Sequence, residues 1–165
     1  MTSTTSSPPP ITHILETCLY VRSITKSVDF YKSVLGLQPF LETPPISGFA
    51  LGSTTLLLFQ LGLTAEDVTP PSGGRIPGHG PSQGIVDMLG TESEPKQQLK
   101  QQLKQHFCLA VKNREDVAKW EEALKERGVQ ITGTMDWEKG GRSVYFSDPD
   151  GHVGEIGSRG IWSHY

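Results

Sequence analysis

Short stretches of alternating hydrophobic and polar residues run through this chain, separated by stretches with the spacing of an amphipathic helix. Residues 14–21 alternate in this way, which predicts a half-buried strand. Leu19 and Val21 share one face of that strand, and Glu16, Cys18 and Tyr20 share the other. A carboxylate therefore projects from the face opposite the predicted core.

The next residues predict a helix and three further strands. Apolar residues recur every three or four positions over Ile24–Leu35, with Ser23 suited to capping the start and Gly36 to ending the helix. Strands are then predicted at Gln38–Glu42, Gly48–Gly52 and Thr54–Gln60, separated by Pro- and Gly-containing turns.

This order of elements returns later in the chain. At an offset of 90 residues (106 − 16), Cys18 aligns with Cys108, while Glu16 aligns with His106. A strand is predicted at His106–Val111, a helix between Asn113 and Gly128, and strands at Val129–Glu138, Arg142–Ser147 and His152–Ser158. The sequence therefore predicts an α+β fold built from a duplicated β-α-β-β-β unit. Because Glu and His are both metal-ligand residue types, the aligned pair points to a site between the copies.

The polar segments define the remaining organisation. We expect a disordered tail over residues 1–11, a first module over 12–62 and a second over 106–162, the two modules forming one domain. Residues 63–105 are predicted to form a Gly- and Pro-rich loop followed by a solvated helix over Lys96–Gln105.

Composition excludes several classes of function. The chain has 165 residues and a net charge of −3, so it offers no basic field for nucleic acid or an anionic membrane. No apolar run is long enough to cross a bilayer, and the N-terminus resembles no signal peptide. With only two cysteines, the expectation is a cytoplasmic protein with reduced thiols.

Two motifs resemble the vicinal oxygen chelate superfamily, which includes glyoxalase I, extradiol dioxygenases, fosfomycin-resistance enzymes and bleomycin-binding proteins. They are Val-Asp-Phe-Tyr-Lys-Ser-Val-Leu-Gly-Leu at residues 28–37 and Gly-Arg-Ser-Val-Tyr-Phe-Ser-Asp-Pro-Asp-Gly-His-Val-Gly-Glu at residues 141–155. The resemblance covers residues 14–62 and 106–162. It implies that the two modules form an open barrel-like cleft, with metal ligands from the first and last strand of each module.

Carried over to this chain, the resemblance implies Glu16, His106 and Glu155 as metal ligands. The fourth position should lie on Thr54–Gln60, where Gln60 could lend a carbonyl oxygen although it is displaced along the strand. One imidazole and two carboxylates suit Zn, Mn, Co, Ni, Mg or Fe(II). Three protein ligands leave positions open for water or substrate.

The leading hypothesis is a metal-dependent lyase or isomerase resembling glyoxalase I. The ion would hold adjacent oxygens of a small-molecule substrate, and Glu155 or Glu16 would shuttle the proton. An extradiol-type dioxygenase and a metal-free, drug-sequestering binding module are the alternatives. Two chains could also pair as a homodimer.

Further residues are candidates for contact with the substrate. They are His79 in the Gly/Pro loop, Arg142, Tyr20, Trp137 and Gln60. The loop around His79 is predicted to fold over the mouth of the cleft, although a solvated tether explains its composition equally well. Cys18 and Cys108 are expected to be reduced and to lie in the cleft.

Overall fold

The fold was determined as a computed structural model and is described for residues 8–89 and 103–165. Residues 1–7 of the predicted tail (residues 1–11) and residues 96–102 of the predicted solvated helix (residues 96–105) lie outside these ranges. Residues 103–105 are described and are not helical. The described helices include none that is long and apolar enough to cross a membrane.

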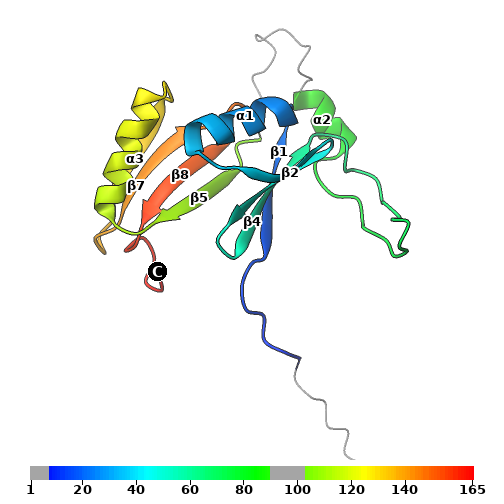
Figure 1. The fold of residues 1–165 in the computed structure, drawn as a ribbon, viewed down its shortest axis with the longest axis horizontal. Coiled ribbons are helices and arrows are strands. Elements are labelled where there is room, and N and C mark those ends of the chain that lie inside the picture. The colour runs from blue at the N-terminus through cyan, green and yellow to red at the C-terminus, as the bar shows by residue number, and fades with distance from the viewer. Residues whose placement is uncertain (1–7, 90–102) are drawn as a thin grey trace, which may run out of the picture.

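Each half of the chain forms one β-α-β-β-β module, as the repeat predicts (Figure 1). The first module contains β1 (Glu16–Val21), α1 (Ile24–Leu35), β2 (Pro39–Thr43), β3 (Ile46–Leu51) and β4 (Thr54–Gln60). The second contains β5 (His106–Val111), α3 (Arg114–Glu126), β6 (Ile131–Asp136), β7 (Arg142–Ser147) and β8 (Val153–Ser158). A short helix between the modules, α2 (Gln83–Leu89), was not predicted.

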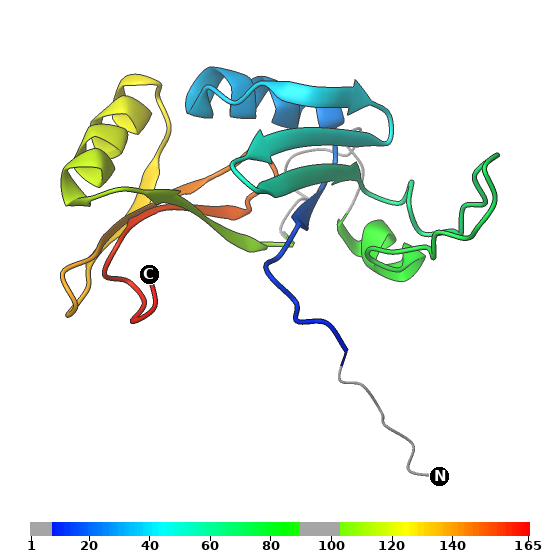
Figure 2. The same ribbon diagram turned by 60° about the horizontal axis from the view of Figure 1, so that its bottom comes forward.

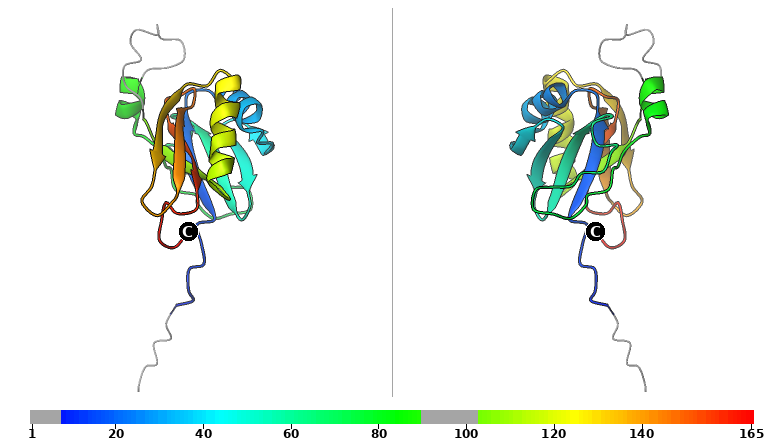
Figure 3. Two further views of the ribbon diagram at one scale, coloured as in Figure 1. Left: turned by 90° about the vertical axis from the view of Figure 1, so that its left-hand side faces the viewer. Right: turned by 90° about the vertical axis from the view of Figure 1, so that its right-hand side faces the viewer.

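The two sheets have the same topology. Their strand orders are β1-β4-β3-β2 and β5-β8-β7-β6, with the first strand of each module parallel to the last. Figures 2 and 3 show two separate sheets that do not close into a barrel, with α3 lying across the second sheet. This arrangement confirms the predicted α+β fold of two similar modules.

Local sequence signals explain where the helices begin and end. The Ser23 side chain accepts a hydrogen bond from the backbone N–H of Lys26, and Asn113 caps α3 in the same way through Asp116. Gly36 closes α1 in the left-handed conformation, with a φ of 70° that favours glycine.

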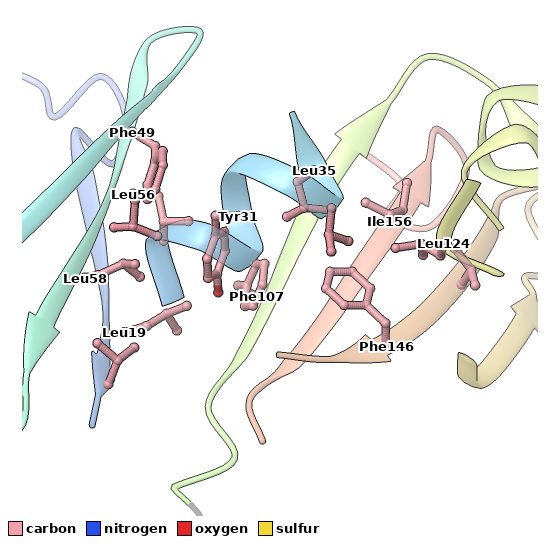
Figure 4. Close-up of a cluster of buried hydrophobic side chains, with 14 of the residues drawn as sticks. Leu19, Tyr31, Leu35, Phe49, Leu56, Leu58, Phe107, Leu124, Phe146 and Ile156 are labelled. Carbon is pink, nitrogen blue, oxygen red and sulfur yellow. The ribbon is translucent and has the colours of Figure 1, made fainter. Parts of the chain in front are cut away.

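A single core joins the modules, and α1 lies within it (Figure 4). The fully buried Tyr31 ring packs against Phe49 of the first sheet at a centroid distance of 5.6 Å and against Phe107 of the second at 6.0 Å. One helix therefore buries aromatic surface from both modules.

A buried polar junction also connects the modules. The turn before β8 places Asp150 against the first module. Its carboxylate accepts hydrogen bonds from the Arg22 backbone N–H at 2.9 Å and from Arg22 Nη1 at 3.2 Å. It also accepts one from the Ser27 hydroxyl at 3.2 Å. The Asp148 carboxylate accepts a hydrogen bond from the Tyr31 hydroxyl at 3.2 Å. Buried His152 lies 2.9 Å from the Tyr20 carbonyl through Nε2. The turn therefore holds the start of α1 to the second sheet.

Candidate functional site

The second sheet brings together two of the three predicted metal ligands. His106 lies at the start of the edge strand β5, and its Nε2 is 3.0 Å from Oε2 of Glu155 on the neighbouring β8. The His106 side chain is 55% exposed, whereas that of Glu155 is only 6% exposed. A buried carboxylate thus meets an accessible imidazole.

Glu155 is held on its other side by a chain of hydrogen bonds. The buried Ser143 hydroxyl donates to Oε1 of Glu155, and the Trp137 indole N–H donates to the Ser143 hydroxyl at 2.8 Å. Both Glu155 oxygens therefore have partners, which fixes the carboxylate orientation. Trp137 was predicted to contact substrate, and the structure shows it supporting Ser143.

Sequence reasoning missed the role of Ser143, although a usable signal was present. Alternation along β7 places Ser143 and Tyr145 on one face and Val144 and Phe146 in the core. Tyr145 is the register partner of Glu155. Ser143 lies two residues from Tyr145 on this face, so alternation gave the face of its hydroxyl, while its pairing with Glu155 follows from the register with β8.

The electrostatics around Glu155 affect its neighbours. Burial of the Cys108 thiol, with the adjacent Glu155 charge as the second cause, raises its pKa to about 12. The same two causes raise the pKa of Tyr145. Both groups stay protonated at neutral pH. Neither thiol is in a disulfide, and Cys18 is half-buried whereas Cys108 is exposed.

The first sheet presents a different surface at the equivalent positions. Cys108 pairs with Glu155 in the second sheet, and Cys18 pairs with Leu57 in the first. Leu57 therefore occupies the position equivalent to Glu155, and Glu16 has no carboxylate partner on the adjacent strand. The Glu16 residue is exposed.

Two predicted site residues lie on the opposite sheet face. Gln60 pairs with Val21, so it shares the helix-side face of β4 with Leu58 and is not placed to act with Glu16. Arg142 alternates with Ser143, and its guanidinium pairs with Glu121 of α3 at 2.9 Å and with Asp136 at 3.2 Å. Strand alternation places both residues on the helix side of their sheets, away from Glu16 and Glu155.

Tyr20 and His79 do meet. The Tyr20 hydroxyl lies 2.6 Å from His79 Nδ1, and the His79 ring packs on Phe59 with centroids 4.6 Å apart. Tyr20 and Phe59 are register partners on β1 and β4. The loop therefore lies against the face that carries Glu16.

The donor set fits part of a metal site. An imidazole and a carboxylate are suitable ligands for a borderline divalent cation. Within residues 8–89 and 103–165, however, no three His, Cys, Asp or Glu side chains converge in a way that could hold a metal. The described residues of one chain supply His106 and Glu155 but do not bring Glu16 to them.

An apolar cavity of about 560 Å³ lies between the modules, within the size range of small-molecule pockets. Its walls come from β1, the end of α1, β3, β4, β5, α3 and β8, and no charged side chain of the described residues lines it. Cys108, the neighbour of Glu155, contributes to one wall. Other lining residues include Thr17, Leu35, Leu56, Trp120 and Ile156.

Comparison with known proteins identifies the family. Residues 11–156 match the Glyoxalase/Bleomycin resistance protein/Dioxygenase superfamily, and the chain belongs to it. No curated protein matches the chain significantly in sequence.

Solved structures extend this comparison. A lactoylglutathione lyase from Agrobacterium tumefaciens is 26% identical, with a TM-score of 0.74 over 94% of this chain and 99% of that one. A glyoxalase/bleomycin resistance protein/dioxygenase from Nocardioides is 20% identical, with a TM-score of 0.61 over 94% of this chain and 86% of that one. A glyoxalase-related enzyme from Fulvimarina pelagi is 19% identical, with a TM-score of 0.59 over 92% and 91%. The latter two similarities concern the fold alone.

Proposed function

We propose that this protein is a metal-dependent lyase or isomerase that acts on a small oxygen-chelating substrate. The observation that carries the proposal is the His106–Glu155 pair, in which a buried carboxylate fixed by Ser143 faces an accessible imidazole. The similarity to a lactoylglutathione lyase supports the reaction class. A bound divalent ion would stabilise negative charge on adjacent substrate oxygens.

His106 and Glu155 would have separate roles in binding the ion and in transferring the proton. His106 and Glu155 would hold the ion, and Glu155 would accept and return a proton, since Ser143 fixes one of its oxygens and leaves the other directed at His106.

Glu16 would complete the site from a second copy of the chain. Glu16 and His106 are both exposed, and no group of three ligand side chains forms among the described residues of a single chain. Two donors leave a divalent ion short of the three protein ligands that catalytic sites usually provide. A homodimer in which each copy lends Glu16 to the other would supply the third.

Mixing two inactive variants tests this arrangement. Glu16→Ala and His106→Ala should each lose stoichiometric metal, measured by elemental analysis after purification without added metal. Co-refolded together, they should regain metal in mixed dimers, because one of the two sites then has all three ligands. Breakdown of S-lactoylglutathione should return in the same sample.

Two results would contradict the proposal. Wild-type protein that carries no metal would exclude a metal-dependent enzyme and favour the second candidate, a ligand-binding protein that uses the uncharged cavity. A variant mixture that recovers no metal would exclude sharing of Glu16 between copies. Lys119→Ala, a change on the exposed face of α3, serves as a control that should retain full metal content.

A further inference from the structure

The loop between β4 and α2 is held by its own hydrogen bonds. The backbone N–H of His79 donates to the Thr64 carbonyl at 2.8 Å, and the Thr64 hydroxyl donates to the His79 carbonyl at 3.0 Å. Val68 and Ile76 form a two-way backbone bridge between these ends. Asp67 also accepts the Gly78 N–H at 2.7 Å. A tether would not need these contacts, and together they fix the position of His79.

His79 is seated closely on the first sheet. Its ring meets Phe59 nearly edge-on, at an interplanar angle of 68°, while Nδ1 meets the Tyr20 hydroxyl. The next residue is Gly80, where a β-carbon would lie 2.6 Å from a ring carbon of Tyr20. Only glycine allows this approach, so the sequence supports the contact between the loop and Tyr20.

The Tyr20 contact determines which nitrogen of His79 carries the proton. A phenol is the better donor and a neutral imidazole nitrogen the better acceptor, so the Tyr20 O–H donates to Nδ1. Burial raises the pKa of Tyr20 to about 12, which keeps this phenol protonated at neutral pH. The imidazole proton then resides on Nε2. No hydrogen bond joins Nε2 to any of the described residues, and His79 is exposed.

We propose that His79 Nε2–H is a hydrogen-bond donor for a carboxylate or carbonyl oxygen of a small molecule, with Tyr20 as the residue that positions it. This inference rests on the proposed function, because it treats the face of β1 that carries Glu16 as the substrate side. There Leu57 stands where the second sheet has a carboxylate, and His79 presents a neutral donor on the same face as Glu16, at Tyr20, four residues further along β1. Such a donor suits a substrate oxygen that gains negative charge.

The first test reads the proton position directly. Two-dimensional ¹⁵N NMR of the metal-free full-length protein should show His79 protonated on Nε2. Tyr20→Phe should shift it toward a mixture of tautomers, while the backbone contacts of residue 20 to Gln105 and His152 are retained. Protonation of His79 on Nδ1 in the wild-type protein would overturn the proposal.

The second test uses glycolate as the probe, again without metal. Glycolate should produce a saturable shift of the His79 Nε2 signal. In the His79 variants, which lack this signal, the Kd is read from the glycolate-dependent shift of the Tyr20 backbone amide. It should stay within about threefold in His79→Gln, whose amide N–H lies near the position of Nε2, and rise about tenfold in His79→Asn and His79→Ala. His13→Ala, an exposed histidine outside the loop, is the matched control.

The outcomes separate this inference from the proposed function. No saturable shift, equal binding by all His79 variants, or better rescue by Asn than by Gln would each overturn it. Because both tests use metal-free protein, they can succeed even where the metal analysis fails. In that case only the proposed enzyme activity would be lost, and the donor site would belong to a binding protein.

Discussion

Replacing Asp150 with alanine should destabilise the whole protein by unlinking its modules. The carboxylate is 8% exposed and accepts three hydrogen bonds from the first module, two from Arg22 and one from Ser27. The Arg22 side chain is itself only 13% exposed. Removing the carboxylate takes away the acceptor of the Arg22 backbone N–H and of the buried Ser27 hydroxyl, and a buried donor that loses its acceptor costs about 1–3 kcal/mol. A typical domain has only about 5–15 kcal/mol of unfolding free energy.

Urea unfolding followed by circular dichroism measures this loss. Asp150→Ala should lower the unfolding free energy by about 1–3 kcal/mol for each donor that loses its acceptor, and Asp150→Asn by less, because an amide oxygen can still accept from Arg22. Asp116→Ala is the matched control: it removes the same charge from an exposed pair with Lys119, 3.3 Å long, and should cost under about 1 kcal/mol. If Asp150→Ala were no more destabilising than Asp116→Ala, the reasoning about the junction would be refuted.

Two further predictions concern buried ionisable groups. Burial raises the pKa of Asp148, so the folded state binds the proton of this carboxyl more tightly than the unfolded state does. The unfolding free energy of the wild-type protein should therefore fall as the pH rises from about 4 through the raised pKa. Asp148→Asn has no proton to lose, so its unfolding free energy relative to wild type should increase between about pH 4 and the raised pKa. A difference between the two proteins that stays constant with pH in urea unfolding would contradict the prediction. Cys108, with its pKa of about 12, should react with iodoacetamide at pH 8 at least about 100-fold more slowly than in urea-unfolded protein, as peptide mass mapping can show. Glu155→Gln should speed the native reaction, and an unchanged rate would argue against the influence of the carboxylate.

The sequence was a good guide to the modules because the signals for them are local. Alternation along β1 and β5, the caps Ser23 and Asn113, and the glycine after α1 each depend on neighbouring residues. The short helix α2 was missed because seven residues give little periodic pattern.

The candidate site was harder to predict because it depends on register between strands. Glu16 pairs with Thr55, which places Leu57 and Phe59 on the ligand-side face of β4, and this offset cannot be read from either strand alone. The sequence analysis therefore chose Gln60, one position off in alternation. The support of Glu155 by Ser143 likewise joins residues from two strands.

The presence of Leu57 opposite Cys18 has an evolutionary consequence. Backbone pairing in both sheets is identical at this point, so the fold does not depend on which side chain stands there. The second module carries a carboxylate at this position and the first an aliphatic side chain, so the first module can vary here while the pair of His106 and Glu155 in the second stays intact. A single Leu57→Glu change would place a second carboxylate at the equivalent position of the first sheet without altering the backbone pairing.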